Sequence, residues 1–182
     1  MLLLYIFILV MLFSSVPYLI RITKNASSVS EMRRQLESEG CKLKTVSPFW
    51  YMGTIDGRRA DFHVLCEGKV ISVKVVSFMS SGIALNFSGK DSYSIKKLKP
   101  SETDADISTY KVKKKAPYDF KAGLPSEWAG LPSAKVIMIL DPYPTKITRT
   151  GKDGKARVLD IADSTGEGEL YSLLSFIELF RK

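Results

Sequence analysis

Four polar side chains in two neighbouring apolar segments have the types and spacing of a catalytic site. Asp61 and His63 stand two positions apart in the first segment, and Ser72 and Lys74 do so in the second. Because side chains alternate between the two faces of a strand, each pair is expected to share a face. The intervening Glu67-Gly68 predicts a tight turn that makes the strands antiparallel neighbours. The pattern therefore predicts that Asp61, Ser72 and Lys74 converge on one sheet face.

These residues and their order resemble the PD-(D/E)xK nuclease superfamily, and most closely its nuclease-related domains. That family has a helix with an early Glu, a strand with Asp, a turn with Gly and a strand reading apolar-Glu-x-Lys. The matching positions here are Glu31, Asp61, Gly68 and Ile71-Ser72-Val73-Lys74. The resemblance spans residues 29–78 and, more loosely, 134–180. It implies a restriction-endonuclease-like fold and, in an active member, metal-dependent cleavage of DNA.

The signature carboxylate of that family is missing, because Ser72 stands in its place. The resemblance implies that an active site would use Asp61 and Lys74 as catalytic residues, with Lys74 positioning the attacking water. It would also need Mg²⁺, which prefers charged oxygen ligands to a neutral hydroxyl. Asp61 alone would hold the ion weakly, and Glu31 is the candidate second ligand. We therefore expect a degenerate site without a cofactor, and Mg²⁺ on Asp61 and Glu31 only if the site is active.

Each of these residues also has a structural interpretation. Asp61 can pair with the preceding Arg58-Arg59 at the start of a strand. Lys74 can be an edge-strand charge that discourages aggregation. His63 is the single histidine of the chain and has no second His or Cys-rich partner set for zinc, so a structural role is expected.

The chain is basic, with a formal net charge of +8. Such lysine-rich runs form a solvated surface, or they bind anionic lipid headgroups or the phosphates of DNA. Charge alone does not separate these interpretations. The candidate binding residues are Lys96, Lys97, Lys99, Lys111, Lys113, Lys114 and Lys115.

The first twenty residues carry no charged side chain, and Arg21 and Lys24 follow directly. A helix needs about 20 mostly apolar residues to cross a bilayer. A single transmembrane helix over residues 1–21 and a juxtamembrane linker over residues 22–28 are therefore expected. The basic flank places the N-terminus outside and the remainder in the cytoplasm, at the cell membrane. A cleaved signal peptide, the alternative, would begin with a basic segment.

Residues 29–182 are long enough for one domain with its own core. Helical spacing predicts a first helix over residues 29–39 and a last helix starting near Gly168. Strands are expected at 42–46, 50–55, 60–66, 70–78 and 134–140, and the last is a continuous apolar run typical of a strand covered on both faces. Short edge strands are expected at 83–87 and 93–95, and a hairpin within 146–161. A long irregular loop is expected at about 96–133. Two cysteines, Cys41 and Cys66, are too few for a disulfide framework and are expected to be free thiols.

The expected fold is α+β: a transmembrane helix followed by one restriction-endonuclease-like mixed sheet flanked by helices. The expected function is a membrane-anchored, catalytically degenerate nuclease-like binding module rather than an enzyme. One alternative is a membrane-tethered, metal-dependent DNA endonuclease. Another is an interaction domain whose basic loop binds anionic lipid or a partner protein.

Overall fold

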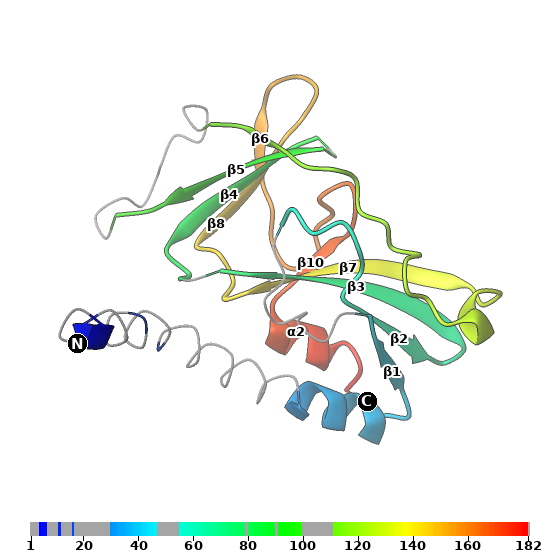
Figure 1. Cartoon of the computed structure of the whole chain (residues 1–182). Coiled ribbons are helices and arrows are strands. Elements are labelled where there is room, and N and C mark those ends of the chain that lie inside the picture. Colours follow the sequence, from blue (N-terminus) through cyan, green and yellow to red (C-terminus); the bar gives the residue numbers. More distant parts are fainter. Residues whose placement is uncertain are drawn as a thin grey trace.

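The computed structural model describes residues 4–6, 11, 16, 30–46, 55–78, 80–89, 91–99 and 111–181. Two five-stranded sheets and a layer of helices make up this part of the chain (Figure 1).

The first sheet has the strand order β1-β2-β3-β7-β10. The first three strands are antiparallel neighbours, and β7 and β10 run parallel to β3. Residues of the turn between β2 and β3 have the positive φ angles of a tight hairpin, 51° at Glu67 and 73° at Gly68, so the predicted turn is confirmed. The strands are β1 (Lys42–Thr45), β2 (Phe62–Cys66), β3 (Lys69–Ser77), β7 (Ser133–Asp141) and β10 (Glu169–Tyr171).

The second sheet has the strand order β6-β5-β4-β8-β9. Its central strands β4 and β8 are parallel, and the other pairs are antiparallel. The expected hairpin within residues 146–161 is confirmed as β8 and β9. The strands are β4 (Ile83–Ser88), β5 (Ser92–Lys97), β6 (Lys113–Lys114), β8 (Lys146–Thr150) and β9 (Ala156–Val158).

Helices cover the face of the first sheet that points away from the second (Figure 1). Residues 30–38 are helical, and α2 (Leu173–Glu178) lies beside them. Met32 and Phe176 are fully buried in the core beneath these helices, which also contains Phe62 and Val73 of the sheet. A short 3-10 helix, η3 (Ser126–Trp128), precedes β7.

Strand β7 is apolar on both sides because both of its faces are covered. Ile137 and Ile139 pack in the core beneath the helices, whereas Met138 and Leu140 pack in the core between the two sheets. The prediction of a strand covered on both faces is therefore confirmed.

The expected α+β fold with one central sheet is wrong. Strands make up 40 % of the chain and helices 17 %, and there are two mixed sheets. The error lies at 83–87 and 93–95, which were expected at the edge of a single sheet. Leu85 and Tyr93 are instead fully buried in the core between the sheets. The physical reason is that β7 needs apolar cover on its second face, and β4, β5 and β8 provide it.

The last helix is shorter than expected. Residues 169–171 form β10, which is drawn into the sheet by its parallel pairing with β7. The helix α2 starts only after Ser172, whose hydroxyl accepts a hydrogen bond from the Ser175 amide in a capping box. The segment expected to be irregular, residues 96–133, contains β6 and η3. Its residues 100–110 lie outside the described part of the chain. Residues 47–54 also lie outside it, and they include most of the strand expected at 50–55.

The expectation of free thiols is also wrong, because Cys41 and Cys66 form a disulfide. Cys41 follows the helix over residues 30–38 after the two turn residues Glu39 and Gly40, and Cys66 ends β2. Register explains the pairing: β1 begins opposite the end of β2, with Lys42 beside Leu65. Antiparallel pairing, which the cysteine count does not reveal, therefore brings the two sulfurs together.

The predicted single-pass transmembrane helix, with the membrane location and orientation derived from it, is contradicted. Nowhere in the described residues is there a helix with the length and apolar character needed to cross a bilayer. Of the expected span, only residues 4–6, 11 and 16 are described, as helical positions. The other positions of residues 1–21 and the expected linker over 22–28 lie outside the described residues.

Candidate functional site

Asp61 and Lys74 form a buried ion pair on the face of the first sheet that points toward the second. Lys74 Nζ lies 2.8 Å from Asp61 Oδ2, and the backbone amide of Val75 donates to the same oxygen at 2.8 Å. Only 8 % of the Asp61 side chain and 3 % of the Lys74 side chain are exposed. The predicted convergence of these two residues on one face is confirmed.

His63 and Ser72 are paired in register on the same face, one step further along β2 and β3. His63 Nδ1 lies 3.0 Å from Ser72 Oγ, and His63 Nε2 lies 3.3 Å from the carbonyl oxygen of Ala122. Ser72 Oγ donates to the carbonyl oxygen of Phe120 at 3.2 Å. These hydrogen bonds attach the loop that contains Phe120 and Ala122 to the sheet. The sequence patterns did not predict this contact.

That loop is braced by Asp119. Its carboxylate accepts hydrogen bonds from the amides of Lys121 and Ala122, each at 3.1 Å. Its backbone amide donates to the carbonyl of Arg58, and its carbonyl accepts from the amide of Ala60. The loop thus lies along the start of β2, next to Asp61, and closes this side of the ion pair.

Burial shifts the pKa values of Asp61, which precedes β2, and of His63 on β2 in opposite directions. Desolvation raises the pKa of the Asp61 carboxyl, although the Lys74 ammonium and the Val75 amide act in the lowering direction. Desolvation lowers the pKa of the His63 imidazole, partly offset by the Ala122 carbonyl. The environment therefore disfavours charge at both positions and favours neutral histidine.

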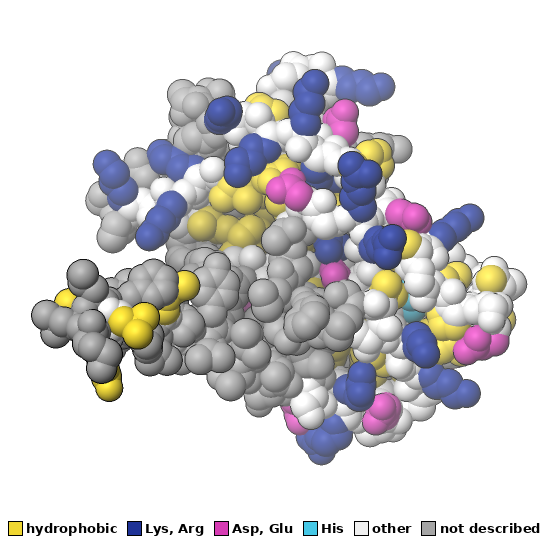
Figure 2. Space-filling view, in the orientation of Figure 1, with side chains coloured by type: hydrophobic (Ala, Val, Ile, Leu, Met, Phe, Trp, Pro, Cys, Tyr) yellow, Lys and Arg dark blue, Asp and Glu magenta, His cyan; other side chains and the backbone are white. Residues whose placement is uncertain are grey.

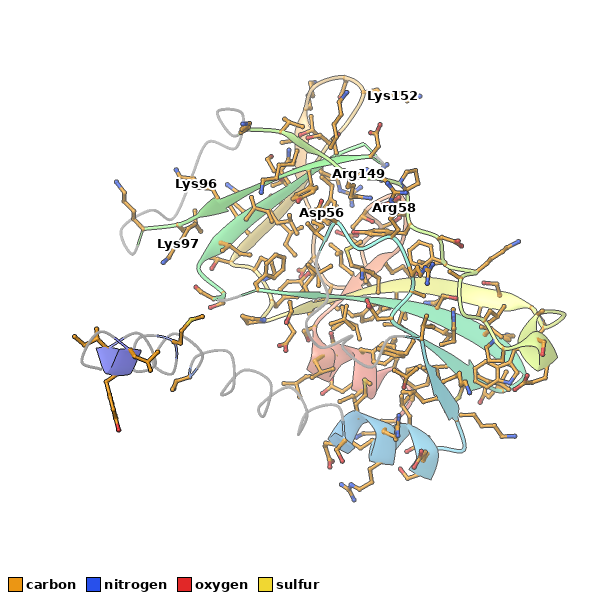
Figure 3. The ribbon with its side chains drawn as sticks, viewed as in Figure 1. Asp56, Arg58, Lys96, Lys97, Arg149 and Lys152 are labelled. Carbon is orange, nitrogen blue, oxygen red and sulfur yellow. A yellow bond between two sulfur atoms is a disulfide. The ribbon has the colours of Figure 1, made fainter. Side chains whose placement is uncertain are left out.

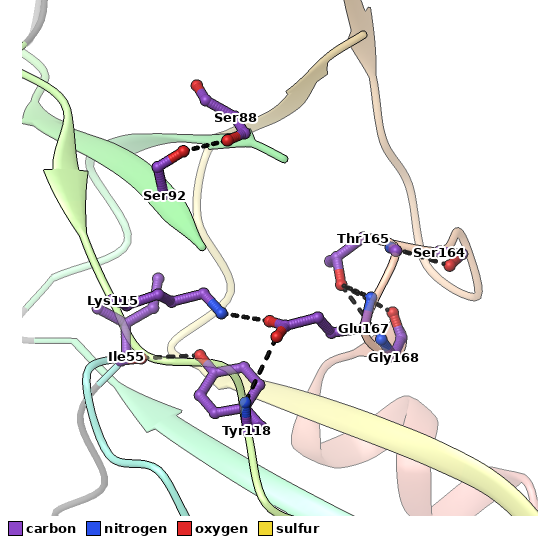
Figure 4. A network of polar contacts seen from close by, with 10 residues as sticks. Ile55, Ser88, Ser92, Lys115, Tyr118, Ser164, Thr165, Glu167 and Gly168 are labelled. Carbon is purple, nitrogen blue, oxygen red and sulfur yellow. Dashed lines mark hydrogen bonds and ion pairs between the residues drawn. The ribbon is translucent and has the colours of Figure 1, made fainter. Parts of the chain in front are cut away.

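A second buried ion pair closes the space between the sheets (Figure 4). The ammonium of Lys115 pairs with the carboxylate of Glu167 and lies 4.0 Å from the ring centroid of Tyr118. The Tyr118 hydroxyl donates to the carbonyl of Ile55 at 2.8 Å. Lys115 was expected to be a binding residue of the surface. Its side chain is fully buried instead, because Glu167 pairs with it between the sheets.

Glu31 lies apart from the Asp61–Lys74 pair. Its carboxylate accepts hydrogen bonds from Arg34 and Gln35 on the exposed side of the helix over residues 30–38. That helix packs on the opposite face of the first sheet through Met32. The second carboxylate that Mg²⁺ would need is therefore not brought to Asp61.

The donor set around Asp61 does not fit a divalent metal ion. One carboxylate oxygen of Asp61 already accepts from Lys74 and Val75, and the Ser72 hydroxyl donates to a backbone carbonyl. In the described parts of the chain, no group of three or more His, Cys, Asp or Glu side chains is arranged to hold a metal. We derive no metal-dependent step from this face.

The remaining predicted lysines gather on the second sheet and the segments that flank it. Figure 2 shows Lys and Arg side chains spread over that part of the molecule, and Figure 3 places Lys96 and Lys97 at the end of β5. Lys96 is half-buried, and the others of this group are exposed: Lys97, Lys99, Lys111, Lys113 and Lys114.

The sequence patterns missed five further cations on the β8–β9 hairpin. Lys146 and Arg149 are half-buried, whereas Lys152, Lys155 and Arg157 are exposed. Figure 3 labels Arg149 and Lys152 of this group. They were interpreted only as parts of a hairpin, because their spacing lacks the dense lysine run that marked residues 111–115. The pairing of β9 with β8 is what brings Arg157 beside Arg149.

Comparison of the chain with protein-family models, with curated proteins and with solved structures gives no match.

Proposed function

We propose that this chain is a non-catalytic, nuclease-like module that binds nucleic acid through the basic surface of its second sheet. The observation that carries the proposal is the separation of two charge systems. The Asp61–Lys74 pair is enclosed, whereas most of the cations of β5, β6 and the β8–β9 hairpin are exposed. Exposed cations can exchange their counterions for phosphates, which is the main source of sequence-independent affinity for nucleic acid.

The absence of catalysis is argued from Asp61. Hydrolysis of a phosphodiester by this class of site needs a metal held by at least two charged oxygens. Glu31, the candidate second ligand, is engaged with Arg34 on the far face of the sheet. Asp61 and Lys74 neutralise each other, so their role in the proposed function is to hold β2 and β3 in register beneath the binding surface.

The test compares charge reversal on the two sheets. Lys113→Glu with Lys114→Glu reverses two exposed charges of β6, and Lys42→Glu with Lys69→Glu reverses two exposed charges of the first sheet. Binding of a fluorescent twelve-nucleotide dT strand is measured by anisotropy between 50 and 200 mM salt (about the range over which phosphate contacts are lost). We expect the β6 variant to weaken binding and to lower the salt slope by about one to two.

The control variant on the first sheet should bind nearly as the parent does. Equal loss in both variants, or no binding by the parent chain at low salt, would contradict the proposal. Binding to vesicles of anionic lipid without binding to the strand would favour the lipid-binding alternative instead.

A cleavage arm separates the binding module from the endonuclease alternative. The parent chain and Asp61→Asn are incubated with plasmid and Mg²⁺ or Mn²⁺, and calorimetry measures metal binding directly. We expect neither cleavage nor metal binding. Cleavage that disappears in Asp61→Asn would establish the endonuclease and overturn the non-catalytic assignment.

A further inference from the structure

The β8–β9 hairpin and the segment after it line an open cleft. Its volume is about 510 Å³, and its wall carries three cationic side chains, Arg149, Lys155 and Arg157. Two carboxylates, Asp153 and Asp163, also line it. The cleft is distinct from the predicted lysine clusters and from the buried Asp61–Lys74 face.

Both carboxylates accept hydrogen bonds from backbone amides of nearby residues. Asp153 accepts a hydrogen bond from the backbone amide of Lys155 at 3.1 Å. Asp163 accepts from the amide of Asp160 at 2.9 Å, and its other oxygen lies 3.9 Å from Arg157. The cations therefore outnumber the acids in the wall, and each acid already has a backbone donor.

Arg149 is held in a fixed position. Its Nη1 donates to the carbonyl of Ser164 at 3.3 Å, and its guanidinium lies against Gly166. A Cβ at Gly166 would stand 2.8 Å from Arg149 Nη2, and the φ of Gly166 is +97°. Glycine suits this position for two reasons: it tolerates the positive φ, and its lack of a side chain leaves space for the guanidinium.

We propose that this cleft binds a phosphate group, with Arg149 as the positioned fork and Lys155 and Arg157 as supporting cations. A guanidinium presents parallel N–H donors that match two oxygens of a phosphate, and Arg149 is already ordered by Ser164. The phosphate can come from a nucleic acid backbone or from free phosphate. The first source rests on the function proposed above, and the second does not.

The experiment titrates inorganic phosphate into the full chain at constant ionic strength and follows the Arg149 Nε–Hε resonance by NMR. We expect a saturable shift. Arg149→Lys keeps the charge but loses the fork, and Lys155→Gln removes an exposed cation without touching Arg149. Each should weaken phosphate binding, Arg149→Lys by about tenfold. The control is Arg34→Lys, on the helix over residues 30–38, and it should leave binding unchanged.

The dT strand is then titrated with the same variants. A parallel loss of strand affinity supports the backbone phosphate as the source. Phosphate binding without any strand binding supports the cleft with free phosphate as its ligand, while the proposed function fails. Strand binding that is the same in Arg149→Lys and the parent, with no phosphate-induced shift, overturns the cleft assignment and leaves the proposed function standing.

Discussion

At the scale of single residues, the polar side chains on the inner face of the first sheet bond to one another and to a neighbouring loop. Asp61 and Lys74 satisfy each other, and Ser72 and His63 fasten the loop around Phe120. The side-chain alternation of two antiparallel strands was enough to predict which of these groups share a face. It was not enough to predict that a loop about 50 positions away would cover them.

Asp61 and Lys74 should contribute to the free energy of unfolding as a coupled pair, so that removing one partner costs more than its own contribution. Asp61→Asn or Lys74→Met leaves one buried charge without its partner, and each should lower the free energy of unfolding by about 3–5 kcal/mol. The double variant should cost clearly less than the sum, because no unpaired charge remains. Urea denaturation of the four proteins gives the coupling. Additive costs would show that the two side chains stabilise the fold independently.

The pH dependence of stability should carry the signature of His63. Its pKa is lower in the folded chain than the usual 6.5, so the unfolded chain binds more protons just below pH 6.5. The free energy of unfolding should therefore fall as the pH drops from 6.5 toward the folded pKa, by at most about 1.4 kcal/mol per pH unit.

His63→Gln should flatten that dependence while keeping a polar side chain on β2. Urea denaturation at pH 7.5 and 5.5 provides the comparison. Asp61, whose pKa is raised, contributes in the opposite direction, because on acidification the folded chain takes up this proton before the unfolded chain does. An equal loss of stability in both proteins on acidification would exclude His63 as the cause.

At the scale of elements, the disulfide and the strand register support each other. Cys41 joins the end of the helix over residues 30–38 to Cys66 at the end of β2. The two cysteines are 25 positions apart, a loop for which the chain-entropy treatment gives a stabilisation of about 3.5 kcal/mol. The link also fixes the helix onto the sheet face that Met32 covers.

Reduction should therefore lower the free energy of unfolding by about 3.5 kcal/mol. The measurement is urea denaturation with and without reductant. The variant with Cys41→Ser and Cys66→Ser should match the reduced chain and be insensitive to reductant. Two free thiols found in the denatured, unreduced protein would contradict the disulfide.

At the scale of the whole molecule, the two sheets differ in where their charged side chains lie. The first sheet lies between the helices and the second sheet, and it holds the enclosed polar pairs. The second sheet and its hairpin carry solvent-exposed cations (Figure 2). Exposed cations on the second sheet, in a chain with a net charge of +8, favour association with a polyanion, while the enclosed pairs contribute to the fold.

Local patterns determined much of this protein. Alternation and a turn with positive φ gave the β2–β3 hairpin and the shared face of Asp61 and Lys74, because both depend only on neighbouring residues. The continuous apolar run within β7 likewise predicted that both faces of this strand would be buried.

Only the tertiary structure decided what provides that cover and which polar groups meet. The second sheet forms because β4 pairs with β8 across 62 positions, as between Leu85 and Ile147, and no local period encodes such a pairing. The same long-range packing separated Glu31 from Asp61, buried Lys115 against Glu167, joined Cys41 to Cys66 and built the cleft around Arg149. The physical reason is that strand pairing fixes the partners of a side chain, whereas its sequence neighbours fix only its direction.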